Sequence, residues 1–72
     1  MESIDTELAA QIRSDIILGM YGRRERLSEA QLSETHSVSR TPVRLALRML
    51  EHEGLIRRSK GRGYYVNAPT VK

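Results

Sequence analysis

The stretch from Ser28 to Gly54 constrains the fold most, because it contains start and stop signals for two short helices. Ser28, with a glutamine three residues later, forms a capping box and predicts a helix over 29–35. Ser39 is a favourable N-cap for the next helix, and Gly54 suits the C′ position that ends it. Residues 36–38 form a tight turn between the two. Two helices joined by so short a turn indicate a helix-turn-helix.

Apolar residues repeat with a helical period in the helix that ends at Gly54 and again near the N-terminus. The first of these has a core stripe at i, i+3, i+4 and i+7, made of Val43, Ala46, Leu47 and Leu50. Residues 4–18 form a further amphipathic helix with an apolar residue at every fourth position: Ile4, Leu8, Ile12 and Ile16. Asp5 or Thr6 can cap its start, and Gly19 suits its stop.

The C-terminal part of the chain changes from helical to strand character. Residues 55–58 and 64–66 are short strand candidates, and the glycine-containing loop 59–63 joins them into a hairpin with a basic tip. The predicted fold is mainly α (small α+β): a three-helix bundle with a helix-turn-helix and a C-terminal two-stranded β wing. We expect one winged helix-turn-helix domain over 1–66 and the start of an interdomain linker at 67–72.

Composition excludes several other classes of protein. The 72 residues suffice for one small domain and leave little room for a deep active-site cleft beside its core. The chain has no cysteine, which rules out disulfides, thiolate catalysis and Cys-rich zinc sites. It has no apolar run of membrane-spanning length and no signal-peptide pattern. We therefore expect a cytoplasmic domain without a cofactor or a metal.

Charge is distributed unevenly along the chain. Residues 1–35 contain seven acidic and four basic side chains, whereas residues 36–72 contain eight basic and two acidic ones. A polyanion would be attracted to the second half, which holds the third helix and the wing. A charged surface that is only solvated would have the same composition. The positions of the charges on the predicted helices and wing therefore have to distinguish a nucleic-acid-binding surface from a solvated one.

On the third helix, the basic side chains share the face opposite the core. With Val43 at zero and about 100° per residue, Arg44 falls near 100°, Arg48 near 140° and Thr41 near 160°. Arginine suits bidentate contact with guanine in the major groove, and Thr41 can bond a phosphate or touch a thymine methyl. Arg40 lies in the first turn, where the helix dipole favours a phosphate. The alternative is that these arginines only keep the helix soluble. However, their i,i+4 spacing places like charges side by side, which costs the helix some stability and therefore favours a functional role.

The wing tip is the second basic element. Lys60 and Arg62 flank Gly61, where a bare backbone can approach DNA closely. A wing can reach phosphates or the adjacent minor groove. The alternative is an ordinary hairpin whose lysine prevents edge-to-edge aggregation. Arg57 and Arg58 extend the same charge, which favours contact with DNA.

These residues carry a resemblance to a known family. The run Val38-Ser39-Arg40-Thr41-Pro42-Val43-Arg44, with Ala46-Leu47, Leu50-Glu51 and Glu53-Gly54-Leu55-Ile56 after it, resembles the helix-turn-helix signature of GntR-type bacterial transcription regulators. The resemblance implies sequence-specific binding of double-stranded DNA. By the same resemblance, the residues of this chain that contact the operator would be Ser39, Arg40, Thr41 and Arg44, and the residues that contact DNA from the wing tip would be Lys60 and Gly61. The second-helix position that is often arginine in such proteins is Ala30 here, so that contact is not carried over.

The resemblance also implies a second domain. The chain is most similar to the subgroup in which an all-helical ligand-binding domain follows the wing and forms the dimer. We therefore expect a homodimer in the full-length protein, and a monomer or weak dimer for this domain alone.

Three positions depart from the family pattern. His36 replaces a usual apolar core residue and is expected to be partly buried. Ser37 replaces the glycine of the turn and is expected to hold a positive φ at some cost. Leu45 replaces a usual glutamate and is expected to face outward.

The sequence gives less support to three other functions: catalysis, metal binding and binding of another protein. No spacing resembles a nucleophile elbow or a catalytic triad, so an enzyme is not expected. Glu51, His52 and Glu53 are consecutive, and consecutive helical side chains cannot converge on one metal ion. A winged helix that binds another protein is the serious alternative, although such modules usually lack basic charge on the third helix and wing.

Overall fold

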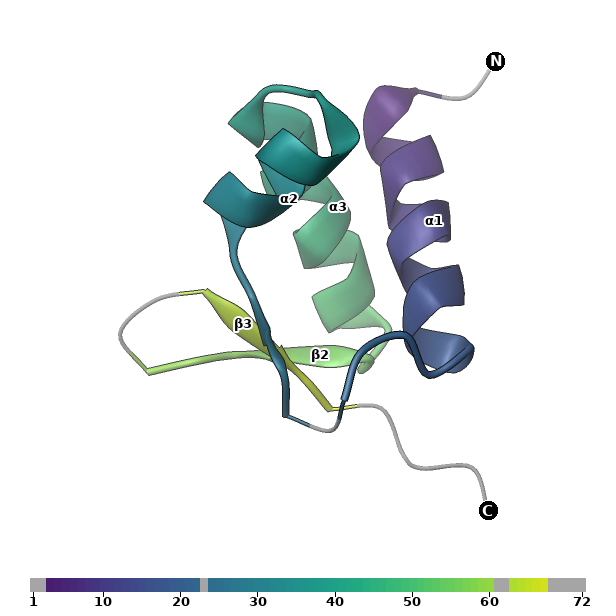
Figure 1. The fold of residues 1–72 in the computed structure, drawn as a ribbon, viewed down its shortest axis with the longest axis vertical. Helices are drawn as coiled ribbons and strands as arrows, with labels where there is room; N and C mark the ends of the chain where they lie inside the picture. Colours follow the sequence, from purple (N-terminus) through teal and green to yellow (C-terminus); the bar gives the residue numbers. More distant parts are fainter. Residues whose placement is uncertain (1–2, 23, 61–62, 68–72) are drawn as a thin grey trace.

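The structure, a computed structural model, describes residues 3–22, 24–60 and 63–67. Helices α1 (Ile4–Ile17), α2 (Glu29–His36) and α3 (Arg40–His52) pack together, and a small sheet lies at one end of them (Figure 1). The sheet contains β1 (Arg26–Leu27), β2 (Ile56–Arg58) and β3 (Tyr64–Val66), paired antiparallel in the order β1-β3-β2. The β2–β3 hairpin projects below α2, to the left in Figure 1. This arrangement confirms the predicted three helices and C-terminal wing.

The starts of the helices follow the predicted caps except in α1. There the Ser3 hydroxyl accepts the N–H of Thr6 at 3.4 Å, so the prediction that Asp5 or Thr6 caps this helix is wrong. The helix already begins at the first apolar residue, and its cap must precede that residue. Ser28 Oγ accepts the backbone N–H three residues on at 3.2 Å, as predicted. Ser39 is the N-cap of α3 through its extended backbone, without a side-chain capping bond.

The three helices end in the same way, in a Schellman motif. In α2, for example, the N–H of Val38 donates to the carbonyl of Ser33 at 3.0 Å. The residue with positive φ is Gly19 (81°) in α1 and Gly54 (85°) in α3, as the sequence predicted. In α2 it is Ser37 (57°), which confirms the expected positive φ at the turn. The turn of the helix-turn-helix therefore uses a left-handed residue with a side chain.

Replacing Ser37 by glycine should stabilise the domain by about 0.5–1 kcal/mol, because glycine adopts positive φ without a Cβ clash. The gain is reduced by the greater freedom of glycine in the unfolded chain. Urea denaturation of the S37G variant measures it. Gly54→Ser, the reverse change at the equivalent position of α3, should lose stability. A less stable S37G would mean that the serine side chain contributes more than its backbone costs.

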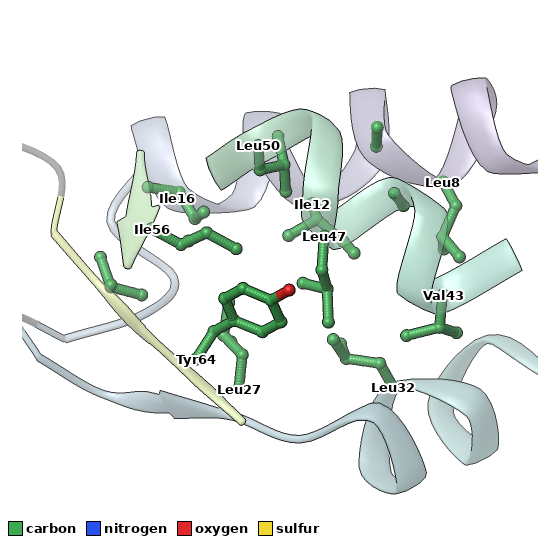
Figure 2. Close-up of a cluster of buried hydrophobic side chains, with 13 residues drawn as sticks. Leu8, Ile12, Ile16, Leu27, Leu32, Val43, Leu47, Leu50, Ile56 and Tyr64 are labelled. Atoms are coloured by element: carbon green, nitrogen blue, oxygen red, sulfur yellow. The ribbon is translucent and has the colours of Figure 1, made fainter. Parts of the chain in front are cut away.

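The core forms between α1, α3 and the sheet (Figure 2). The four predicted α3 residues are fully buried, and the other buried apolar residues are Leu8, Ala9, Ile12, Ile16, Leu27, Leu32, Ile56, Tyr64 and Val66. Ile4 is 58% exposed, which corrects its assignment to the buried stripe. A four-residue step advances about 40° around a helix, so Ile4 lies roughly 120° from Ile16. His36 is half-buried, as expected.

A third strand, β1, adds to the predicted two-stranded wing. Arg26 pairs with Tyr65 and Leu27 with Tyr64, so the segment before α2 is bonded to the wing. At this junction Gly63 has φ 75°, and a Cβ there would lie 3.1 Å from the carbonyl oxygen of Leu27. The glycine is therefore required by close approach as well as by φ. The strand fixes the wing relative to the start of α2.

The fold continues to the end of the described chain. The N–H of Asn67 donates to the carbonyl of Leu55 at 2.9 Å, so the backbone is still attached at this residue. The boundary between residues 66 and 67 stays a prediction, since 68–72 lie outside the described residues. In the described part of the chain, no helix has the length and apolar character needed to cross a membrane.

Candidate nucleic-acid interface

The exposed face of α3 carries the predicted recognition residues. Val43 and the other core-stripe residues have no exposed surface, which fixes the rotation of the helix. Thr41, Arg44 and Arg48 are exposed on the opposite side, as the 100° spacing predicted. Leu45 is 42% exposed, as expected. The helix therefore presents a row of polar and cationic side chains to solvent.

A hollow of about 620 Å³ lies between the start of α2, the exposed side of α3 and the wing. We call it the basic hollow, because its lining includes five exposed arginines: Arg26, Arg40, Arg44, Arg48 and Arg58. Glu29 is the acidic residue in the same lining. Five cations around a concave, solvent-open surface create a positive potential that attracts a polyanion. The site has the charge and the shape to receive a phosphate backbone.

Arg44 is paired with Glu29 across the junction of α2 and α3. Its Nε donates to Glu29 Oε2 at 3.2 Å, and its Nη2 donates to Glu29 Oε1 at 3.3 Å. The side chains are 51% and 27% exposed. The hydrogen bonds to Glu29 and, after them, the negative charge of Glu29 raise the pKa of Arg44 above its ordinary value. The pair fixes the orientation of a guanidinium that the sequence alone left free.

Arg58 links the wing to α3. Its guanidinium carbon lies 5.7 Å from the centre of the Tyr64 ring, and its Nη2 donates to the Tyr64 hydroxyl at 3.4 Å. The same Nη2 lies 3.6 Å from Glu51 Oε1. Cation–π and charge contacts together hold this arginine on the wing side of the basic hollow.

The structure brings most of the predicted site residues into one region. Arg40, Arg44 and Arg48 line the basic hollow, while Ser39 and Thr41 are exposed at the start of the same helix. Lys60 is exposed next to Ser59, which also lines the hollow. Gly61 and Arg62 lie outside the described residues. Their role, like that of the whole set, stays a prediction.

Sequence reasoning missed two residues of this region, Arg26 and Glu29. Arg26 reaches the hollow because β1 pairs with β3, and a two-residue strand leaves no periodic signal. For Glu29, the sequence indicates only a place at the start of a capped helix. Its position three residues before Leu32, on the first turn of a helix packed against α3, could have suggested that it faces α3.

Glu53, which follows the last residue of α3, is paired with an arginine of α1. Arg13 of α1 donates from Nε and Nη2 to the two carboxylate oxygens of Glu53, at 2.8 and 2.7 Å. These hydrogen bonds lower the pKa of Glu53 below its usual range. In the ranges that the structure describes, no three His, Cys, Asp or Glu side chains gather as metal ligands would.

Comparison with known proteins agrees with this geometry. The family model described as "Bacterial regulatory proteins, gntR family" matches residues 4–66. The chain is 36% identical over 62 residues to the uncharacterized HTH-type transcriptional regulator YdhC of Bacillus subtilis, covering 86% of this chain and 28% of YdhC. It thus spans about a quarter of the length of the curated relatives it matches.

Solved structures share the fold. A putative GntR transcriptional regulator from Rhodococcus sp. RHA1 superposes with a TM-score of 0.84 at 35% identity, over 92% of this chain and 32% of that one. The DNA-binding domain of AraR, in complex with operator ORR3, superposes with a TM-score of 0.82 at 26% identity, over 93% of this chain and 82% of that one.

Proposed function

Since this chain belongs to the gntR family of bacterial regulatory proteins, we propose that it is the part of a transcriptional regulator that binds double-stranded operator DNA. Helix α3 enters the major groove, and the wing tip contacts the adjacent minor groove or the backbone. The row of exposed arginines on α3, continued by the basic hollow, is the observation that carries this proposal. Proteins of this family are regulators of transcription and not enzymes.

The residues divide by the kind of contact that their chemistry suits. Arg44 and Arg48 lie one helical turn apart and suit guanine O6 and N7. Phosphates near the start of α3 are contacted by Ser39, Arg40 and Thr41. On the wing the contacts are made by Lys60, Gly61 and Arg62, the last two from the sequence pattern alone.

The complete regulator is proposed to contain more than this domain. The curated relatives are about three to four times as long, and the resemblance to the all-helical subgroup implies an effector-binding domain that also joins two copies. Such a homodimer would act on DNA in the bacterial cytoplasm.

Selection of tight-binding duplexes from a random pool, followed by titration at low and high salt, tests the proposal. If four phosphates are contacted, affinity should fall about 100-fold between roughly 50 and 200 mM salt. A scrambled duplex of equal length should bind more weakly than the selected one. Absence of binding to any duplex at low salt would contradict DNA binding and favour a winged helix that binds protein.

The helix and the wing should contribute differently to DNA binding. Arg44→Ala should weaken binding to the selected duplex about 5- to 150-fold and relax preference at one base pair. Lys60→Ala should weaken binding to all duplexes alike and reduce the slope of log affinity against log salt by about one. Titrations of both variants with the selected and scrambled duplexes measure these effects. A K60A variant that loses sequence preference at unchanged salt slope would reverse the assignment.

A further inference from the structure

Glu29 places a negative charge on the surface that is proposed to face DNA. It shares the lining of the basic hollow with five arginines and is only 27% exposed. A carboxylate near phosphates is repelled by them, so it weakens general attraction to any nucleic acid. A carboxylate at this position therefore weakens DNA binding unless one of its contacts has a compensating effect.

The geometry of its contact with Arg44 supplies one. A guanidinium has five N–H donors in one plane. Glu29 uses the side edge, formed by Nε and Nη2 of Arg44, at 3.2 and 3.3 Å. Within residues 3–22, 24–60 and 63–67, no hydrogen bond involves the end edge, formed by Nη1 and the second hydrogen of Nη2, so this edge can bind another ligand. That edge presents two parallel donors, as bidentate contact with guanine O6 and N7 requires.

We infer that Glu29 is a positioning residue for base recognition: it holds Arg44 by one edge so that the other edge meets a guanine. This inference rests on the proposed function. Glu29 belongs to α2 and Arg44 to α3, so the packing of the two helices fixes the guanidinium within the hollow. An arginine held in this way loses less side-chain freedom when it binds a base. Glu29 therefore increases selectivity while it reduces attraction to phosphates in general.

The two effects have opposite signs in the Glu29→Gln variant. This change keeps the size of the side chain and removes its charge. Preference for the selected duplex over the scrambled duplex should fall at least about threefold, because the guanidinium is held less firmly. Affinity for the scrambled duplex should stay constant or rise, because a repulsive charge is gone. A role limited to folding would lower both affinities together.

Glu34→Gln is the matched control. Glu34 is an exposed acidic residue of the same helix, and the variant loses the same charge. It should leave the preference unchanged within twofold. Melting curves should be close to wild type for E29Q, since an exposed ion pair contributes little to stability. Exchange of the Arg44 Nε–H with solvent, followed by NMR in the absence of DNA, should be faster in E29Q even if its melting point falls.

The double variant with Arg44→Ala decides between positioning and direct contact. In the R44A background, Glu29→Gln should no longer change the preference, because there is no guanidinium to hold. If it lowers the preference equally in both backgrounds, Glu29 contacts a base itself, as a carboxylate can do with cytosine N4, and the inference is wrong. Unchanged preference in E29Q also overturns it. Failure of the proposed function is distinguishable, because wild type itself would then show no duplex binding or no preference.

Discussion

Replacing Leu47 by alanine should destabilise the domain by about 2–5 kcal/mol. Leu47 has no exposed surface and belongs to the same buried cluster as Tyr64 and Leu50 (Figure 2). Its loss removes apolar contacts between α3 and the rest of the fold and leaves a cavity. At roughly 0.05–0.15 kcal/mol per residue, a domain of this length has only about 4–11 kcal/mol of stability. The variant should therefore unfold at much lower urea concentration and lose DNA binding as α3 loses its support.

Leu45→Ala makes the same change two residues away on the same helix. Leu45 is 42% exposed and faces solvent, so this variant should lose less than about 0.5 kcal/mol. Urea denaturation of the two variants side by side measures the difference. Similar losses from both would contradict the orientation of α3, and with it the assignment of its exposed face to DNA.

The orientation of α3 could be predicted because its pattern is unambiguous. Four apolar residues at i, i+3, i+4 and i+7 leave one way to bury the helix, and burying them puts Arg44 and Arg48 on the far side. The ends of the helices were equally predictable where glycine occupies the C′ position. Ser37 shows that the same geometry forms without glycine when the flanking helices are fixed by packing.

The features that the sequence did not reveal depend on contacts between distant segments. β1 is two residues long and forms only because β3 lies beside it, so no local sequence pattern predicts this strand. The same strand brings Arg26 to the basic hollow. Ile4 fits a four-residue repeat but lies roughly 120° around the helix from Ile16, away from the buried face. The Glu29–Arg44 pair joins residues 15 positions apart, and only the packing of α2 on α3 puts them in reach.

The surface of the domain bears on how it assembles. Large apolar side chains are exposed at the end of α1, namely Ile17 (62%), Leu18 (72%) and Met20 (70%). Three neighbouring residues are a small patch beside the roughly 800 Å² per partner that a stable interface buries. We therefore expect this domain to sediment as a monomer or weak dimer at micromolar concentration.

Joining two copies of the chain by a flexible linker should raise affinity for a duplex with two half-sites about 100- to 10,000-fold over a single copy. One recognition helix contacts too few base pairs to select one operator in a genome, and helix-turn-helix regulators use two half-sites about 34–36 Å apart. A Gly/Ser linker of about 40 residues has an average reach of about 35 Å, which matches that spacing. Once one copy is bound, the second therefore binds at high effective concentration.

Titration of the linked pair with one-site and two-site duplexes measures this gain, and sedimentation of the single chain checks its monomeric state. Arg44→Ala in one copy of the pair is the control. It keeps the linker and most of the charge, but it should reduce the gain about 5- to 150-fold, because one copy then binds its half-site more weakly. Equal affinity of the linked pair for both duplexes would show that the second copy contributes nothing. A stable dimer of the free domain would show that this domain supplies its own interface, and that dimerisation does not depend on another domain.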